Sequence, residues 1–316
     1  DPVLVKASTH HDIPHSQTWP LARQRWHLGL VNATFTKRRC DGCIFTAINK
    51  IEKNMIFVLH FTQLCIKFAP IPTVPTVAGN NNMTEKTGKY PFLAEPFHCD
   101  FSNRLFMGHL GNHLLNAADF HANDRGFGMN YLMPLHRTWV LSRLVIEMEE
   151  MPKAYDRFYV ETWVESAMRL FTSRNFAVTG EDGQVYGYGR SVWAMIDMQT
   201  RQPVDILAMR DGQILDYVET EKPCPIAKPA RVKMGDGATL VRTVQTNYSD
   251  VDVNGHINSV KYIEHMLDLF PISWYQTHRV RRFEVAYVAE AHGGDLLDCY
   301  REQVGEGEYC IRIIKK

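Results

Sequence analysis

Two stretches of the chain share one pattern, and this internal repeat constrains the fold more than any other feature. Residues 108–110 read Gly-His-Leu and residues 255–257 read Gly-His-Ile, at an offset of 147 positions (255 minus 108). Both lie beside a segment with helical spacing of apolar residues, and runs of alternating apolar and polar residues follow. Such a repeat indicates two copies of one unit in which a helix packs against an antiparallel sheet. We therefore predict an α+β fold with repeats at residues 83–205 and 239–316, joined by a linker at 206–238.

The two repeats differ in the number of strands predicted after the helix. The first has four strand-like runs, at residues 138–149, 157–166, 169–179 and 185–198. The second has three, at residues 279–291, 295–304 and 308–315. We also interpret residues 97–101 as a short strand before the first helix. The second repeat is thus predicted to lack a final strand of about 10 to 15 residues, which would leave an unpaired sheet edge.

A dense set of polar residues precedes the second helix. Asp250, Asp252, Asn254 and His256 occupy alternate positions, and the Asn-Gly step among them is typical of a tight turn. The apolar face of the helix follows at Ile257, Val260, Ile263, Leu267 and Phe270. Each polar residue alone is most simply explained as a cap or a surface group. Four of them within seven residues, at a helix N-terminus that favours negative charge, make this simple explanation much less favoured for the group as a whole.

This stretch resembles the second-repeat motif of the acyl-acyl-carrier-protein thioesterases of plants and bacteria. That motif reads Asp-x-Asp-x-Asn-x-His-x-Asn-x-x-Lys-Tyr-Ile, and each of its fixed residues occurs between Asp250 and Ile263. The resemblance covers most of residues 83–316 and implies a tandem (double) hotdog fold, in which a curved antiparallel sheet wraps a long helix in each repeat. It also implies hydrolysis of fatty acyl thioesters on acyl carrier protein, which releases free fatty acid and terminates fatty-acid synthesis.

The resemblance implies four catalytic residues, namely Asp252, Asn254, His256 and Glu290. Glu290 lies in the sequence Tyr-Val-Ala-Glu-Ala, which corresponds to Tyr-Arg-Arg-Glu-Cys in the plant enzymes. Because Ala291 stands where those enzymes have cysteine, a thiol nucleophile is excluded at this position.

These residue types suit the attack of water on a thioester. The leaving thiol has a pKa of about 8.5, so hydrolysis needs a base and oxyanion donors rather than a strong acid. Either Glu290 or Asp252 can be the base, and we favour Glu290. Asn254 and His256 can polarise the carbonyl or move the proton. Backbone N–H groups at residues 257–259 can complete the oxyanion site.

The resemblance also suggests how the substrate binds. The first repeat is expected to shape the acyl-chain tunnel, although tryptophans on strands are more often simply core residues. The candidate tunnel residues are Trp139, Arg143, Trp163 and Trp193. The acyl carrier protein is acidic in the resembling systems, so a basic docking patch is expected for it, with a solvated strand end as the alternative. The candidate docking residues are Lys261, Arg279, Arg281 and Arg282.

Other functions remain open at this point. An acyl-coenzyme A thioesterase of the same fold and a non-catalytic acyl-binding protein are the alternatives. The formal net charge of zero gives no support for a nucleic-acid partner, and a homodimer is compatible with the sequence. We expect no cofactor and no metal. His109 and His113 have helical metal-ligand spacing but no carboxylate at that spacing, and Cys40-x-x-Cys43 lacks a second ligand pair.

Residues 1–82 do not share the periodicity of the rest of the chain. We interpret them as an extension outside the family, upstream of a natural start at Met83. The apolar run at residues 56–66 is too short to span a bilayer, and serine is too rare here for a plastid transit peptide. Seven scattered cysteines do not suggest a disulfide framework, so a bacterial cytoplasmic location is expected.

Overall fold

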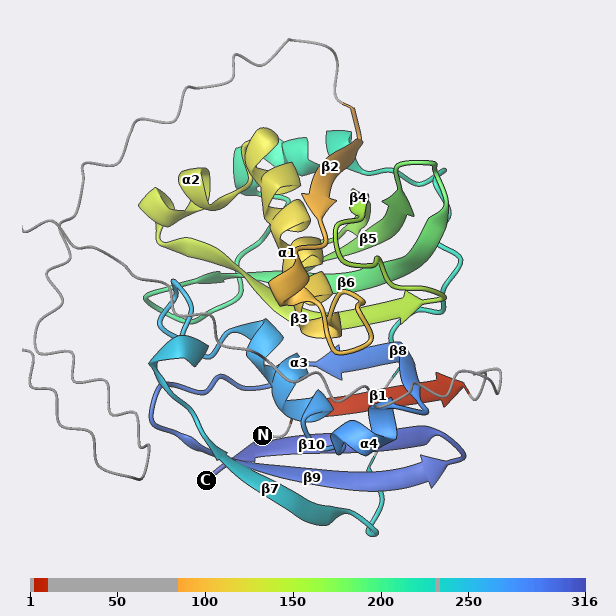
Figure 1. Ribbon diagram of the computed structural model, residues 1–316. Coiled ribbons are helices and arrows are strands. Elements are labelled where there is room, and N and C mark those ends of the chain that lie inside the picture. Colours follow the sequence, from red (N-terminus) through yellow and green to blue (C-terminus); the bar gives the residue numbers. More distant parts are fainter. Residues whose placement is uncertain (1–2, 11–84, 231–233) are drawn as a thin grey trace, which may run out of the picture. The chain divides into compact units, whose positions relative to one another are not determined.

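A single antiparallel sheet connects both repeats in the computed structural model, which describes residues 3–10, 85–230 and 234–316. In this part of the chain, ten strands follow one another in the order β2-β4-β5-β6-β3-β8-β1-β10-β9-β7 (Figure 1). Strand β3 of the first repeat pairs with β8 of the second, so the two repeats meet at the middle of the sheet. The predictions for Cys40, Cys43, Met83 and the apolar run at residues 56–66 lie outside the described residues.

Each repeat places one long helix between its first and second strands. The strands of the first repeat are β2 (Thr87–Leu93), β3 (Arg137–Met148), β4 (Arg157–Ala167), β5 (Phe171–Gly180) and β6 (Val185–Asp197). Those of the second are β7 (Thr239–Gln245), β8 (Arg279–Ala286), β9 (Leu296–Gly305) and β10 (Glu308–Lys315). The helices are α1 (Met107–Asp124), α2 (Met129–Leu132), α3 (Ser259–Leu267) and α4 (Ile272–Tyr275). The predicted α+β tandem of helix and antiparallel sheet is confirmed, with all four predicted first-repeat strands present.

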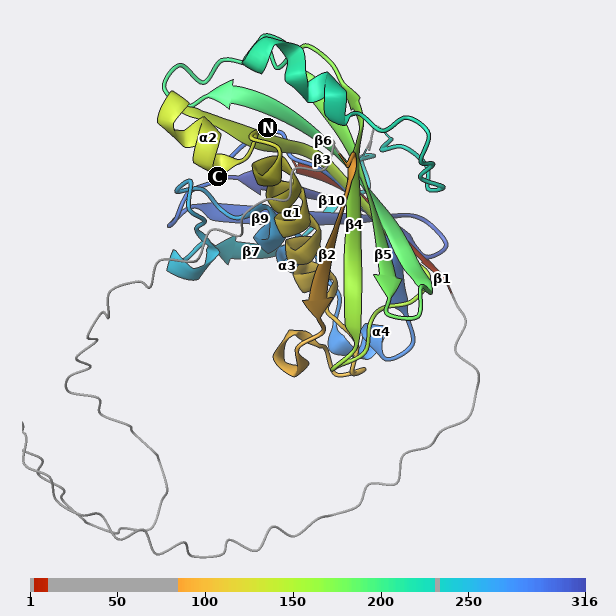
Figure 2. The same cartoon turned by 90° about the horizontal axis from the view of Figure 1, so that it is seen from above.

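The two long helices contact each other inside the curve of the sheet (Figure 2). Their apolar faces form one core, and five of their side chains have no exposed surface: Leu110, Leu114, Ala117, Ile263 and Met266. The spacing of these residues is the helical period read from the sequence. A Cβ atom on Gly111 would lie 3.1 Å from Cδ1 of Ile263, so the missing side chain lets α1 approach α3 closely.

An N-terminal strand occupies the place of the strand that the second repeat lacks. Strand β1 (Val3–His10) pairs antiparallel with both β8 and β10, and Val5 lies opposite Val285 on one side and Ile311 on the other. In the first repeat the equivalent place, between β5 and β3, belongs to β6. The prediction of only three strands after the second helix is confirmed. The expected unpaired edge is wrong, because a segment from the opposite end of the chain covers it.

The predicted strand at residues 97–101 is wrong. A 3₁₀ turn over Pro96–His98 takes its place, followed by a single bridge between Cys99 and Leu105. Proline favours the first position of such a turn, since it has no backbone N–H to donate and its φ is preset. The true first strand is β2, where Pro91 is tolerated because β2 lies at the edge of the sheet.

The predicted linker is partly ordered by apolar contacts. It contains a 3₁₀ segment over Met209–Tyr217, and Val218 forms a bridge with Val164 of β4. Ile206 and Ile214 are buried in a small cluster against the first repeat. Among the described residues, no helix is both long and apolar enough to cross a membrane.

Candidate active site

The polar stretch before α3 forms a tight hairpin loop. Asp252 accepts backbone hydrogen bonds at Oδ1 from Asn254 (2.8 Å) and His256 (3.4 Å), and its own N–H donates to the carbonyl of His256 (2.8 Å). Gly255 has a φ of 81°, a left-handed conformation that glycine adopts without strain. The Asp252 carboxylate therefore shapes the loop and presents Asn254, which is exposed, at its tip.

Asp250 anchors the base of this loop. Its carboxylate accepts the backbone N–H of Asn247 at 2.7 Å in a capping box, and its carbonyl accepts that of Asn258 at 2.8 Å. Asn258 in turn caps α3 by accepting the N–H of Val260 at 3.0 Å. Asp250 is buried, as a capping residue of a loop base should be, and it does not face the loop tip.

His256 and Glu290 lie side by side. His256 Nε2 is 3.4 Å from Glu290 Oε2, and their side chains are 25% and 35% exposed, so water can reach both. The ring of His292 stands nearly perpendicular to that of His256, with centroids 5.1 Å apart. Ile257 N–H donates to the carbonyl of Ala291 (2.9 Å), a bond that holds the Glu290 segment against the loop.

That same bond overturns part of the predicted oxyanion site. The N–H of Ile257 donates to Ala291, and the N–H of Asn258 donates to Asp250. Two of the three backbone groups expected to bind the oxyanion are thus engaged in holding the loop. The sequence pattern could not reveal this, because both acceptors depend on how the loop folds back on its neighbours.

Arg201 is a site residue that the sequence analysis missed. Its guanidinium donates to Glu290 Oε2 from the turn that follows β6, so the first repeat contributes to a site built mainly by the second. The turn is fixed by Asp197, whose Oδ1 accepts the N–H of Thr200 at 2.8 Å, and Arg201 has a φ of 60°. The Asp-x-x-Thr sequence indicates a turn, but nothing in it identifies a partner 89 residues away.

Replacing Arg201 tests whether it positions Glu290. We expect Arg201→Ala to lower kcat/KM about tenfold, or about 1.4 kcal/mol, and to change the pH profile, whereas Arg201→Lys should retain part of the activity. Arg169→Ala is the matched control, because Arg169 is 77% exposed and pairs with Asp205 away from Glu290. Wild-type rates and an unchanged pH profile in Arg201→Ala would show that this ion pair has no role.

A mostly apolar cavity lies in the first repeat, between α1 and strands β3 to β6. It encloses about 590 Å³, including space open to solvent. Trp139 and Trp193 line it, and each indole N–H is bonded, to the carbonyl of Phe127 (2.8 Å) and to Ser191 Oγ (2.7 Å) respectively. These two predicted tunnel residues are therefore held in fixed orientations.

The other two predicted tunnel residues do not line this cavity. Trp163 is fully buried in the core, with Lys222 Nζ 4.8 Å from its ring centre. Arg143 donates to the carbonyl of Ala230 at 3.0 Å and borders a different hollow. Both lie on β-strands as expected, but they face away from the cavity that Trp139 and Trp193 share.

The cavity and the Glu290 cluster lie at the same end of β3. Tyr287 N–H donates to the carbonyl of Ser142 (2.9 Å), so the chain after β8 continues along β3 toward its first residues. Arg137, at the start of β3, is paired with Asp197, which begins the turn that carries Arg201. Since Arg201 binds Glu290, the cluster sits beside the β3 end that contributes Trp139.

Five polar side chains interrupt the apolar cavity wall: Asp119, His121, Arg125, Thr172 and Arg174. Burial lowers the pKa of Arg174 to about 10 and that of His121 to about 2, and it raises the pKa of Asp119. Arg174 Nη1 donates to Thr162 Oγ1 at 3.2 Å, and His121 Nε2 lies 3.1 Å from the carbonyl of Lys86. The remaining wall is formed by aliphatic and aromatic side chains, so the cavity suits a largely apolar ligand.

Two models of known protein families match this chain, one over each repeat. The family model of the acyl-ACP thioesterase N-terminal domain matches residues 88–209, and that of the acyl-ACP thioesterase C-terminal domain matches residues 236–313. The chain belongs to the acyl-ACP thioesterase family. The family resemblance inferred from the motif at residues 250–263 is confirmed.

Relatives of this acyl-ACP thioesterase family member include bacterial and plant proteins. A crystal structure of an acyl-ACP thioesterase from Bacteroides thetaiotaomicron is 52% identical, with a TM-score of 0.66, covering 73% of this chain and 98% of that one. The palmitoyl-acyl carrier protein thioesterase of Gossypium hirsutum is 28% identical over 192 residues, covering 57% of this chain and 46% of its own length.

Two further relatives extend the comparison. The oleoyl-acyl carrier protein thioesterase 2 of Arabidopsis thaliana is 25% identical over 227 residues, covering 66% of this chain and 61% of its own length. The chain thus spans about half to two thirds of these plant relatives. The 12:0-ACP thioesterase of Umbellularia californica is 18% identical with a TM-score of 0.61, covering 74% of this chain and 100% of that one, and it shows that the fold is shared.

The first repeat of this chain contains a second copy of the hairpin loop. Asp100 Oδ1 accepts the N–H of Ser102 at 2.8 Å, and Asp100 N–H donates to the carbonyl of Arg104 at 2.8 Å, the same bonds and lengths as in the Asp252 loop. The repeats therefore correspond at an offset of 152 (252 minus 100), and the predicted offset of 147 is wrong. His256 corresponds to Arg104 rather than to His109.

This correction explains why the two loops differ chemically. Arg104 Nη2 lies 3.5 Å from Glu150 Oε1, so an arginine pairs with a glutamate beside this loop, whereas the second repeat has His256 beside Glu290. An arginine stays protonated at physiological pH and cannot take a proton from water or return one. The first repeat keeps the loop but not its acid–base pair, which supports a single active site per chain.

The predicted basic docking patch is mostly neutralised by neighbouring carboxylates. Arg281 pairs with Glu149, and Arg282 pairs with Glu147 and Glu284. Lys261 Nζ lies 2.7 Å from Glu264 Oε2 on the same helix, whereas Arg279 is exposed. Three of the four predicted docking residues thus hold β8 and α3 in place, and we do not assign a carrier-protein surface to them.

Proposed function

We propose that this protein hydrolyses fatty acyl thioesters carried by acyl carrier protein and so terminates fatty-acid synthesis. The observation that carries this proposal is the pair of His256 and Glu290, 3.4 Å apart, at the β3 end that also borders an apolar cavity. The acyl-phosphopantetheine arm of the carrier protein brings the thioester to this pair. A homodimer and the cytoplasmic location stay predictions.

The proposed reaction uses Glu290 as the base. Its carboxylate takes a proton from a water molecule, and the water oxygen attacks the thioester carbonyl to form a tetrahedral oxyanion. Asn254 at the loop tip donates an amide N–H to that oxygen. When the C–S bond breaks, protonated His256 gives its proton to the leaving sulfur, which yields a carboxylic acid and the carrier thiol, and Glu290 passes the proton taken from water to His256 to restore the pair.

The local bonding favours Glu290 over Asp252 for this role. Asp252 Oδ1 already accepts two backbone N–H groups of its own loop, which ties the carboxylate to the turn. Glu290 instead contacts His256 and Arg201, two side chains from other segments, and lies open to water. We therefore assign Asp252 to positioning of Asn254 and His256.

The cavity is proposed to hold the acyl chain, with Trp139 and Trp193 on its wall. We expect Ala118→Phe, which adds a ring to the cavity lining, to shift released fatty acids toward shorter chains. Each methylene that no longer fits loses about 0.8 kcal/mol, or roughly fourfold in kcat/KM. Product analysis over a panel of acyl-carrier substrates measures the shift. Asn116→Leu, an exposed position on the same helix, is the control.

Paired assays test the proposed substrate class. The purified chain is incubated with matched acyl-carrier-protein and acyl-coenzyme A thioesters, and thiol release is followed for each. Faster turnover of the carrier-linked substrate is the expected result. Preference for coenzyme A substrates supports the alternative acyl-coenzyme A thioesterase, and tight acyl binding without thiol release supports an acyl-binding protein.

A further inference from the structure

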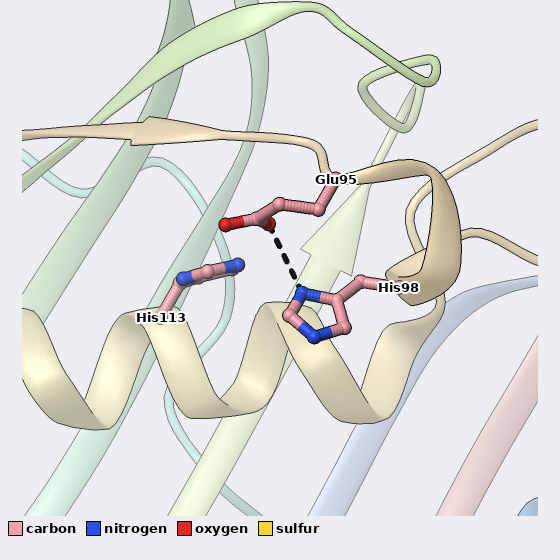
Figure 3. Close-up of side chains that lie close together, drawn as sticks. All are labelled: Glu95, His98 and His113. Atoms are coloured by element: carbon pink, nitrogen blue, oxygen red, sulfur yellow. Dashed lines mark hydrogen bonds and ion pairs between the residues drawn. The ribbon is translucent and has the colours of Figure 1, made fainter. Parts of the chain in front are cut away.

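A cluster of two histidines and one glutamate lies at the β2–α1 connection, away from the proposed active site. Glu95 precedes the 3₁₀ turn, His98 is the last residue of that turn, and His113 projects from the second turn of α1 (Figure 3). Each side chain offers one ligand atom, and these atoms all lie within 4.8 Å of one another. Figure 3 shows the Glu95 carboxylate directed between the two imidazole rings.

His113 is only partly buried as a residue, but its ring nitrogens are the part of this cluster that is shielded from solvent. Its ring packs against Phe92 (centroids 4.6 Å apart) and Phe158 (5.5 Å). Both ring nitrogens are buried, and neither has a hydrogen-bond partner among the residues that the structure describes. A buried polar group without a hydrogen-bond partner lowers the free energy of unfolding by about 1–3 kcal/mol. A bound ligand that contacts a His113 ring nitrogen would remove this cost.

The other two members are oriented and reachable. Glu95 Oε2 lies 3.0 Å from His98 Nδ1, and their side chains are 44% and 40% exposed, so an ion can enter from solvent. The ring of His109 stacks on that of His98, with centroids 4.1 Å apart and planes inclined by 22°. Support of this kind from a neighbouring ring restrains the direction in which His98 presents its nitrogens.

The second repeat provides an internal comparison. At the offset of 152, Glu95 and His98 correspond to Asn247 and Asp250, which form the capping box at the base of the catalytic loop. In the first repeat the equivalent turn has no side-chain cap. The first-repeat loop therefore forms without a capping side chain. The Glu95 carboxylate and the His98 imidazole face each other and His113 instead.

We propose that Glu95, His98 and His113 bind one divalent transition-metal ion. Two imidazoles and a carboxylate suit Zn²⁺, Co²⁺ or Ni²⁺, whereas Mg²⁺ and Ca²⁺ prefer all-oxygen sites. Ligand atoms about 2.0–2.2 Å from tetrahedral zinc lie roughly 3.4 Å apart, so small side-chain rotations close the site. The ion would tie the β2–α1 connection to α1 and leave one coordination position for water.

Cobalt absorption tests the proposal without reference to thioester hydrolysis. Chelator-treated full-length protein is titrated with Co²⁺, and Zn²⁺ is then used to displace it. We expect visible d–d absorption that saturates at one equivalent, and a rise in Tm when Zn²⁺ is added. Glu95→Gln, a conservative change at a half-exposed residue, and His113→Ala should each weaken binding about 100-fold or more.

His265→Ala is the matched control, because His265 holds the position in the second repeat that His113 holds in the first. It should leave the stoichiometry and affinity for Co²⁺ unchanged. Absence of d–d absorption in the wild-type protein, or wild-type affinity in both Glu95→Gln and His113→Ala, would overturn the proposal. Since the readout is metal binding alone, that result and a failure of the thioesterase assay are separate outcomes.

Discussion

His256→Ala and Glu290→Gln are each expected to lower kcat by about 100-fold or more. Loss of a positioned base or proton donor typically has an effect of this size. The two side chains lie 3.4 Å apart and are partly exposed, so neither substitution removes core packing. Single-turnover rates with an acyl-carrier substrate, together with Tm values to confirm folding, measure the effect.

Asp252→Asn distinguishes the two candidate bases. Asparagine keeps an Oδ1 acceptor for the N–H groups of Asn254 and His256, so this variant should lose much less activity than Glu290→Gln. Asp100→Asn, the same change in the equivalent loop of the first repeat, is the matched control and should leave the rate unchanged. A severe loss in Asp252→Asn with near-normal rates in Glu290→Gln would reverse the assignment.

Removal of residues 1–10 is expected to lower the free energy of unfolding by on the order of 5 kcal/mol, a large share of the stability of a typical domain. Strand β1 pairs with β8 on one side and β10 on the other, so its loss leaves two ladders of backbone groups unpaired in the interior of the sheet. Buried backbone groups without partners are costly, and exposed strand edges promote aggregation.

Complementation by a peptide sharpens this test. A synthetic peptide with the sequence of residues 1–11 should restore Tm and solubility to the truncated chain. The same peptide with Val5→Pro is the control, since proline cannot donate to the ladder at this position between Val285 and Ile311. Unchanged stability after truncation, or equal rescue by both peptides, would show that β1 is dispensable.

Local patterns predicted much of this fold correctly. The helical spacing of apolar residues identified α1 and α3, and the alternating runs identified β3 to β6 and β8 to β10. They failed at residues 96–98, where proline favours a turn, and at β2, where glycine and proline mask the strand pattern. The internal repeat was detected, but its two copies were aligned at the wrong offset. The Gly-His pairs used for the alignment occupy different places in the two repeats.

The sequence alone determined the two-helix, antiparallel architecture, the family and the polar loop from Asp250 to His256, because each depends on periodicity or on residues close together in the chain. Only the tertiary structure decided the rest. It brought Arg201 to Glu290, put β1 in the place of the missing strand, and gathered Glu95 and His98 beside His113. These contacts join distant segments whose meeting depends on how the whole sheet closes around its helices, and no local pattern encodes that closure.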